Sequence, residues 1–371
     1  MNVMYCVPIG TRGGVERFLE DVIVRHNPRR VAPTVLAFSN GAWLNDLKMR
    51  QIKVYCLESM RLRHPYRVFR AVNNILKNER IDLVHSTYPY CHALSAPAAL
   101  WNRCKQMWFH HGPLSTSRWQ GGTSLLPADL VLANSRFLYE RLRRTFYIAR
   151  RTAVLHYGID VASFQPDEFK RQHFRKEWNI AEDEIAVGLV GFIERWKGQD
   201  VLLKAALRLR THTPRLKIFI IGRPRSGLVE QGCLQFQAEL QAFVTEHGLQ
   251  DMVTFTGHLD VREGALDGLD IFVHSSTEAE PFGMVLLEAM AKKKAIIASA
   301  AGGPLEILST GVDGLLIPPR QPELLADHIG NLADDPDLRR NLGDQAQRTA
   351  IERFNADAVT RKLEVYYEEL M

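Results

Sequence analysis

The sequence TEAEPFGMVLLEAMAKKKA, residues 277–295, decides how the rest of the chain is interpreted. It follows LDIFVH (269–274), an apolar run that predicts a buried strand. After a Pro-Phe-Gly turn, apolar residues recur at helical spacing, at Val285, Leu286, Ala289 and Met290. Two carboxylates stand eight residues apart, Glu280 in the loop and Glu288 inside the predicted helix. Helical side chains lean toward the N-terminus of their helix, so both carboxylates can face the helix start.

The start of this predicted helix suits a ligand that carries both phosphate and hydroxyl groups. Its first backbone N–H groups are free, and the helix dipole is positive there. Gly283 lets a ligand come close to the backbone. A nucleotide sugar is a ligand of this kind, because its phosphates bind N–H groups and its hydroxyls bind carboxylates. For any single glutamate, an ordinary surface position is the alternative interpretation.

Apolar strand-like runs alternate with helical patterns along the whole chain, which is typical of parallel sheets covered by helices. The strands predicted in the N-terminal half are 2–7, 33–38, 52–57, 81–85, 106–110, 129–133 and 152–155. Those predicted in the C-terminal half are 185–191, 216–221, 252–256, 270–274, 295–299 and 314–317. A polar segment that contains Pro166 lies between the two sets, at 157–180. With 371 residues, the chain is long enough for two α/β domains, each with its own core.

Charge is distributed unevenly along the chain. Residues 1–160 contain 23 Lys and Arg against 10 Asp and Glu, a net charge of +13. The remainder contains 24 basic and 32 acidic residues, a net charge of −8. The basic half predicts an anionic partner: an anionic membrane face, a lipid-phosphate acceptor or an anionic polysaccharide. Nucleic acid is disfavoured, because no helix-turn-helix, RNP or zinc-finger pattern occurs.

Two basic stretches in this half also contain aromatic residues. They are RLRHPYRVFR (61–70) and RFLYERLRRTFYIARR (136–151), and the second is amphipathic. A basic amphipathic helix can lie on anionic lipid, whereas a solvated helix that packs on its own sheet is the alternative.

The five cysteines are scattered, without metal-ligand spacing, which favours thiols in a reducing cytoplasm. No apolar run reaches the ~18 residues that span a bilayer, and the N-terminus lacks the pattern of a signal peptide. We therefore expect a cytoplasmic protein, with peripheral contact at the inner face of the membrane left open.

Three further strand-to-loop junctions carry candidate site residues. GTRGGVERFLEDVI (10–23) places glycines before a helix, which suits an anion or a plain tight turn. MWFHHGP (107–113) ends a strand in two histidines, where side chains of a parallel sheet face ligands. FIERWKG (192–198) carries Arg195 and Lys197, two cations that can neutralise a diphosphate leaving group.

Taken together, EPFGMVLLEAMA (280–291) resembles the E-x7-E signature of the retaining family-4 glycosyltransferases of the GT-B fold. The resemblance implies two Rossmann-like parallel-sheet domains that face a central cleft. Residues 1–165 would bind the acceptor and 166–354 the nucleotide-sugar donor, and a helix at 355–371 would cross back to the first domain. The implied reaction is retaining hexosyl transfer to a hydroxyl of a glycan or lipid-linked glycan, in cell-surface polysaccharide synthesis. The implied donor is a UDP-sugar first and a GDP-sugar next, with no cofactor and no metal ion.

The resemblance also implies roles for individual residues. Catalytic roles fall to Glu280, His111, Arg195 and Lys197, although Phe192 stands where the family often has Arg or Asn. Donor-binding positions are Gly13, Gly14, Gly222, Phe255, Gly257, Phe282, Gly283, Met284, Val285 and Glu288, of which Glu288 binds the ribose. Acceptor-binding positions are Glu16, His85 and His110, and His110 is also the alternative to His111 beside the sugar. HYGID (156–160) resembles the family's N-G-I-D with Tyr157 in place of Asn, which argues against a specific role for that position.

Other interpretations predict other chemistry. The Asp-x-Asp at 335–337 contains a proline and predicts a helix start rather than a metal site. Two carboxylates also suit a glycoside hydrolase, but a glutamate inside a helix suits ribose hydroxyls better. The remaining alternatives are a sugar-nucleotide epimerase or hydrolase of the GT-B fold and a non-catalytic nucleotide-sugar-binding subunit. The full set of Arg195, Lys197, Glu280 and Glu288 argues against a degenerate site.

Overall fold

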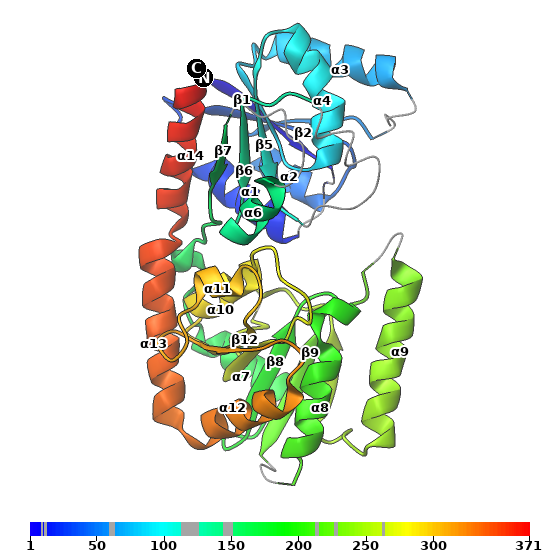
Figure 1. Cartoon of the computed structure of the whole chain (residues 1–371), viewed down its shortest axis with the longest axis vertical. Helices are drawn as coiled ribbons and strands as arrows, with labels where there is room; N and C mark the ends of the chain where they lie inside the picture. Colours follow the sequence, from blue (N-terminus) through cyan, green and yellow to red (C-terminus); the bar gives the residue numbers. More distant parts are fainter. Residues whose placement is uncertain are drawn as a thin grey trace. The chain divides into compact units, whose positions relative to one another are not determined.

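Alternating strands and helices build two α/β units in a computed structural model (Figure 1). The structure describes residues 1–8, 10, 13–58, 64–112, 126–143, 151–211, 215–225, 229–261 and 264–371. Unit 1 comprises Met1–Ile159 and Phe354–Met371, and unit 2 comprises Asp160–Arg353. Parts of the two predicted basic stretches, 61–63 and 144–150, lie outside the described residues.

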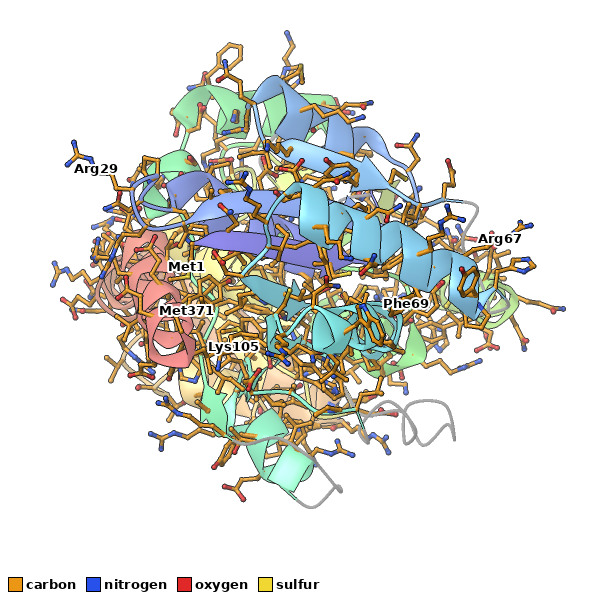
Figure 2. All side chains as sticks on the ribbon, turned by 90° about the horizontal axis from the view of Figure 1, so that it is seen from above. Met1, Arg29, Arg67, Phe69, Lys105 and Met371 are labelled. Atoms are coloured by element: carbon orange, nitrogen blue, oxygen red, sulfur yellow. The ribbon has the colours of Figure 1, made fainter. Side chains whose placement is uncertain are left out.

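Unit 1 contains a seven-stranded parallel sheet in the order β3-β2-β1-β4-β5-β6-β7. Its strands are β1 (Asn2–Val7), β2 (Ala32–Ala37), β3 (Lys53–Cys56), β4 (Leu83–Ser86), β5 (Lys105–His110), β6 (Leu130–Ala133) and β7 (Thr152–Val154). Its helices are α1 (Gly14–Arg25), α2 (Ala42–Met49), α3 (Pro65–Asn78), α4 (Pro89–Trp101), α6 (Arg136–Arg143) and α14 (Ala356–Leu370). Helices α3 and α4 share one core with β1, β2 and β4, and Figure 2 shows Arg67 and Phe69 on α3.

Unit 2 contains a six-stranded parallel sheet in the order β10-β9-β8-β11-β12-β13. Its strands are β8 (Ile185–Val190), β9 (Leu216–Ile221), β10 (Val253–Gly257), β11 (Ile271–His274), β12 (Ala295–Ser299) and β13 (Leu315–Ile317). Its helices are η1 (Val161–Phe164), α7 (Glu168–Glu177), η2 (Arg195–Lys197), α8 (Gln199–Leu209), α9 (Glu230–Glu246), α10 (Met284–Ala291), α11 (Pro304–Ile307), α12 (Pro322–Asp334) and α13 (Pro336–Arg353).

The prediction of parallel-sheet domains is confirmed. Each of the thirteen predicted strands overlaps one observed strand. The central strands are buried, and buried parallel strands are continuous apolar runs that stand out in the sequence. The expected helix start at the Asp-Pro-Asp sequence is also confirmed. Helix α13 begins at Pro336, and the Asp335 carboxylate accepts a hydrogen bond from the Leu338 N–H at 2.8 Å.

Both sheets reverse their strand order at one point. In unit 1 the first strand, β1, lies between β2 and β4, and in unit 2 the first strand, β8, lies between β9 and β11. Connections from the two central strands leave on opposite sides, so a crevice opens beyond their carboxyl ends, where ligands bind in open α/β sheets. The residues that follow β1, β4, β8 and β11 are therefore the first places to look for a site.

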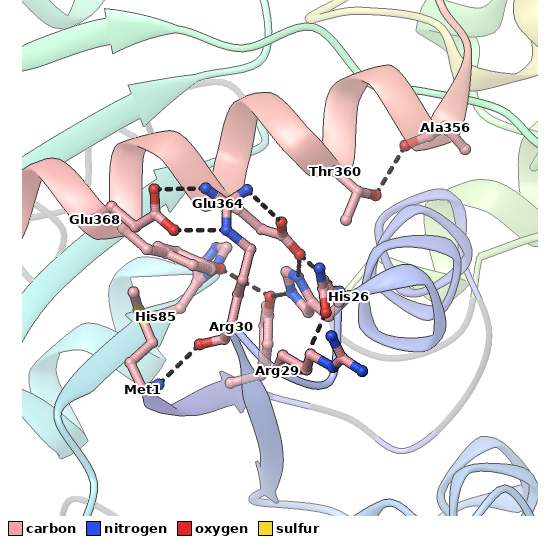
Figure 3. Close-up of polar contacts among 12 residues, drawn as sticks. Met1, His26, Arg29, Arg30, His85, Ala356, Thr360, Glu364 and Glu368 are labelled. Atoms are coloured by element: carbon pink, nitrogen blue, oxygen red, sulfur yellow. Dashed lines mark hydrogen bonds and ion pairs between the residues drawn. The ribbon is translucent and has the colours of Figure 1, made fainter.

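Helix α14 completes unit 1 through a buried polar network (Figure 3). The Glu364 carboxylate pairs with His26 Nδ1 at 3.0 Å and accepts from the Asn27 N–H at 2.9 Å. The Tyr367 hydroxyl bonds to the Tyr5 hydroxyl at 2.8 Å and to His85 Nδ1 at 2.6 Å. The last helix of the chain is thus tied to β1, β4 and the end of α1.

Candidate functional site

The loops that follow β8 and β11 meet at the strand-order reversal of unit 2. The Ser275 hydroxyl donates to the Gly198 carbonyl at 2.7 Å, and the Thr277 N–H donates to the Trp196 carbonyl at 2.7 Å. Gly198 has φ +72°, and a Cβ there would lie 1.9 Å from the Ser275 carbonyl oxygen. Only glycine fits at this position. The close approach brings Lys197, at the end of the first loop, over the second loop.

Glu280 is the centre of a buried cluster of charged and polar side chains. Its Oε2 atom lies 2.6 Å from Lys197 Nζ and 3.3 Å from His274 Nε2. His274 Nε2 also lies 3.2 Å from the Ser276 hydroxyl. Both contacts of Glu280 are made through Oε2. The cluster joins the end of β11, the loop before α10 and η2.

The electrostatics of this cluster keep Glu280 ionised. Burial alone would raise the pKa of the Glu280 carboxyl, but the Lys197 ammonium and the contact with His274 outweigh burial and lower the pKa to about 2. The Lys197 ammonium also lies 3.9 Å from the centre of the Trp196 ring, so the cation is held from two sides.

The backbone of Glu280 is positioned by two glycines that follow β12. The Glu280 N–H donates to the Ala301 carbonyl at 3.2 Å, and the Gly303 N–H donates to the Glu280 carbonyl at 2.8 Å. Gly302 has φ +76°, and a Cβ there would lie 2.2 Å from the Glu280 carbonyl oxygen. The SAAGG sequence therefore holds the loop that carries the carboxylate.

Helix α10 begins beside this cluster. Gly283 caps its N-terminus with φ +105°, and Glu280 Cγ lies within 3.5 Å of the place that a Cβ of Gly283 would take. Phe282 is buried, Met284 and Val285 are half-buried at the first turn, and Glu288 is buried within the helix. The first-turn N–H groups and positive dipole of α10 thus lie next to an ionised carboxylate.

Arg195, in contrast, makes its contacts away from Glu280. Its Nη2 atom lies 2.6 and 2.7 Å from the two carboxylate oxygens of Glu239, and its guanidinium stacks on Phe236 at 4.8 Å. Both partners belong to α9. With Phe236 and Thr277, Arg195 lines an open pocket of about 410 Å³.

The predicted donor-binding glycines Gly222 and Gly257 meet at the ends of β9 and β10. The Gly222 N–H donates to the Gly257 carbonyl at 2.7 Å. A Cβ on Gly222 would lie 1.8 Å from the Gly191 carbonyl oxygen. Phe255 is half-buried on β10. Phe192, where the resemblance leads one to expect Arg or Asn, carries the guanidinium of Arg225 at 4.9 Å from its ring centre.

In unit 1, His111 follows β5 and is tied to the segment that leaves the domain. Its Nδ1 atom lies 2.6 Å from the Tyr157 hydroxyl, and its carbonyl accepts from Asn134 Nδ2 at 3.1 Å. Phe18 of α1 stacks on Tyr157 at 4.6 Å. Within the part of the chain that is described, His111 Nε2 has no hydrogen-bond partner. Tyr157, which departs from the family pattern, is thus the hydrogen-bond partner of His111.

Burial keeps both neighbouring histidines neutral. It lowers the pKa of His110 to about 4 and the pKa of His111 well below its ordinary value. His110 packs against Trp108, with ring centres 5.3 Å apart. The two side chains therefore face different neighbours, as successive residues at a strand end do.

The start of α1 carries the other predicted residues of unit 1. Gly13 caps the helix and Gly14 is its first residue. Glu16 is buried, and burial raises the pKa of its carboxyl to about 7, although the backbone N–H groups of Glu16 and Gly13 act in the opposite direction. His85 is fully buried, and its Nδ1 atom contacts Tyr367 of α14.

Sequence reasoning missed His274 and Tyr157, which contact predicted residues, and Ser276, which contacts His274. His274 and Ser276 stand at the end of an apolar strand run and just after it, which is a usable signal. Tyr157 was discounted because it departs from the family pattern. Among the described residues, no group of three His, Cys, Asp or Glu side chains could hold a metal ion, and no helix is long and apolar enough to cross a bilayer.

Comparison with known proteins gives two family matches. Residues 12–163 match the model described as Glycosyltransferase Family 4, and residues 170–349 match the one described as Glycosyl transferases group 1. The chain is 30% identical over 226 residues to a D-inositol 3-phosphate glycosyltransferase of Corynebacterium urealyticum, covering 59% of this chain and 51% of that protein. It is 29% identical over 228 residues to the lipopolysaccharide core biosynthesis mannosyltransferase LpcC of Rhizobium leguminosarum bv. viciae, covering 59% and 60%. The chain thus spans about half the length of the first of these relatives.

Solved structures share the fold over the whole chain. Anabaena Alr3699/HepE in complex with UDP and glucose has a TM-score of 0.87 at 24% identity, with both chains fully covered. WaaG, a glycosyltransferase involved in lipopolysaccharide biosynthesis, has a TM-score of 0.73 at 14% identity, covering 98% and 99% of the two chains. The architecture is that of GT-B glycosyltransferases, as the sequence predicted.

Proposed function

Because the chain belongs to family 4 of the glycosyltransferases, we propose that it is a retaining hexosyltransferase. It moves a sugar from a nucleoside-diphosphate sugar to a hydroxyl of a glycan or lipid-linked glycan, in the synthesis of a cell-surface polysaccharide. The observation that carries this proposal is the Lys197–Glu280–His274 cluster beside the start of α10. It offers an ionised carboxylate, a cation and free N–H groups within one edge of a sheet.

Glu280 binds and orients the transferred sugar. Its Oε2 atom is held by Lys197 and His274, which leaves Oε1 to accept hydrogen bonds from sugar hydroxyls. A carboxylate with a pKa of about 2 keeps its charge throughout the physiological pH range. It can therefore stabilise the positive charge that the anomeric carbon develops as the glycosidic bond breaks.

The leaving diphosphate is stabilised by protein groups without a metal ion. Lys197 and the N-terminal N–H groups of α10 supply positive charge at the place where charge develops. Glu288 binds the ribose hydroxyls. The bond from the anomeric carbon to phosphate breaks, the bond to the acceptor oxygen forms on the same face, and the acceptor's proton passes to the diphosphate.

In unit 1, His111 acts as a neutral hydrogen-bonding group for a sugar hydroxyl. Tyr157 engages Nδ1, so Nε2, which is buried and has no hydrogen-bond partner among the described residues, is the nitrogen left for a sugar hydroxyl. Glu16 and the glycines at the start of α1 bind polar groups of the substrates. All five cysteines are free thiols, which suits work in a reducing cytoplasm.

A donor panel tests the proposal first. Release of nucleoside diphosphate from UDP-, GDP- and ADP-sugars would be followed in the presence of EDTA, with binding calorimetry in parallel. UDP-sugars come first because HepE, which shares the fold, is seen with UDP and glucose. Saturable binding of one donor and an acceptor-dependent release that EDTA leaves intact are expected. An NMR spectrum of the product should show the anomeric configuration of the donor, and inversion would refute the retaining mechanism.

The role of Glu280 predicts the effect of Glu280→Gln. This change keeps the shape of the side chain but removes the charge, and we expect kcat to fall roughly 100-fold or more. The matched control is Glu323→Gln on α12, which removes an exposed carboxylate paired with Arg208 in the same unit. Initial rates at saturating donor would measure kcat for both variants. Turnover near that of the parent chain in Glu280→Gln would contradict the role proposed for Glu280.

A further inference from the structure

Helices α3 and α4 present large aromatic side chains to solvent. Tyr66 and Trp101 are 73% and 72% exposed, and Leu100 is 47% exposed. The Phe69 ring meets Trp101 edge to face, with ring centres 6.3 Å apart. The aromatic residues of the two helices are therefore continuous, and they form a patch rather than single exposed side chains.

An apolar pocket lies within this patch. It has a volume of about 290 Å³ and is lined by Pro65, Tyr66 and Phe69 of α3 and by Ala93, Leu94 and Pro97 of α4. Below it, the inner faces of both helices pack on the core of unit 1. Phe69 is partly buried against this core, whereas Tyr66 and Trp101 lie outside it.

The charged residues within the two helices are all basic. The 14 residues of α3 and the 13 residues of α4 include no Asp or Glu. Arg67 and Arg70 are exposed on α3, and Arg103 is exposed just after α4. Figure 2 shows Arg67 projecting outward from α3 and Phe69 on the side of α4. We call the group of Tyr66, Arg67, Phe69, Arg70 and Trp101 the α3–α4 surface.

We propose that the α3–α4 surface docks on an anionic lipid membrane. Tyr and Trp prefer the boundary between lipid headgroups and acyl chains, where one end of the side chain is wet and the other is apolar. Arginines beside them attract anionic headgroups. The pocket between the helices accepts part of an acyl chain. This surface would hold the protein where a lipid-linked acceptor resides.

Vesicle binding tests the inference without any nucleotide sugar, so its failure and the failure of the proposed function are distinguishable. The full chain would be mixed with vesicles of 30% phosphatidylglycerol in phosphatidylcholine and with pure phosphatidylcholine vesicles, and sedimented at low and high salt. Binding to the anionic vesicles, weakened by salt, is expected. Arg67→Gln with Arg70→Gln should weaken the partition roughly 30-fold. Tyr66→Ser with Trp101→Ser should weaken it roughly tenfold or more.

The matched control is Phe169→Ser, which removes a 79% exposed aromatic residue from α7 of unit 2 and should leave vesicle binding unchanged. Circular dichroism spectra of all variants should match that of the parent chain. Equal binding of parent and both double variants would overturn the inference. So would a dimer, seen by light scattering, that dissociates in Tyr66→Ser with Trp101→Ser, because a second copy would then cover the surface.

Discussion

Two cations that stand two residues apart have different partners. The Lys197 side chain is 17% exposed and forms an ion pair with Glu280. The Arg195 side chain is 62% exposed and forms an ion pair with Glu239 of α9. An exposed ion pair is worth about 0–1 kcal/mol, so Arg195 can leave Glu239 for a more highly charged ligand. A diphosphate is such a ligand, since an arginine fork matches its oxygens.

If Arg195 binds the donor, Arg195→Gln should raise the donor KM roughly tenfold or more, because a charge-assisted contact is lost. Glu239→Gln should leave the donor KM unchanged or lower it, because it frees the same arginine. Steady-state kinetics with varied donor would compare the two variants. A rise in donor KM of equal size in both variants would instead indicate that the Arg195–Glu239 ion pair serves to position α9.

At the scale of elements, strands and site-bearing loops were predictable, but contacts between elements were not. Continuous apolar runs reveal buried parallel strands directly. Glu280 precedes a helix whose start can be predicted from the sequence. The partnership of Tyr157 with His111 joins residues 46 positions apart. The contact of Arg195 with Glu239 depends on α9, a helix that begins 35 residues later in the chain. Such contacts follow from how elements pack, which no local pattern of residues records.

Helix α14 provides a prediction at this scale. Glu364 is buried and accepts from His26 and Asn27, so Glu364→Ala leaves buried polar groups without a partner. We expect the free energy of unfolding of unit 1 to fall by about 3 kcal/mol. Glu368→Ala removes only a carboxylate that is 38% exposed and should cost less than about 1 kcal/mol. Hydrogen exchange in β1 and β4 would measure both, and equal losses of protection would show that the network does not stabilise the unit.

Across the whole molecule, the two units bury different titratable groups. In unit 1, burial lowers the pKa of five histidines. The pKa falls to about 3 for His85 and to about 4 for His92 and His110. The pKa values of His26 and His111 are also lowered. In unit 2, the pKa of Glu280 is lowered to about 2, because Lys197 and His274 outweigh its burial. The two units should therefore respond differently to mild acid.

Between pH 7 and pH 5, unit 1 should lose stability because of its buried histidines. Glu280 should leave the stability of unit 2 unchanged over the same range. A buried histidine stays neutral in the folded state, whereas the unfolded chain takes up its proton below about pH 6.5. Each such histidine then costs about 1.4 kcal/mol per pH unit in the free energy of unfolding. Glu16 acts in the opposite direction, because its pKa of about 7 makes the folded state the one that binds the extra proton. Glu280 gives stability that is complete above about pH 4.5 and is lost only as pH falls toward 2.

Hydrogen exchange at pH 7, 6 and 5, corrected for the intrinsic rates, would resolve the two units by peptide. Peptides from residues 1–112 should lose protection first, while those from β8, β9 and β12 keep theirs. His92→Gln removes one of the five histidines, which stacks on Trp108 at 5.1 Å, without touching the proposed site. The free energy of unfolding of unit 1 should then change less steeply with pH, by up to one proton. This holds whether or not the variant also changes the stability of unit 1 at pH 7. The same pH dependence in both units would contradict the argument, because the buried histidines with lowered pKa values among the described residues all lie in unit 1.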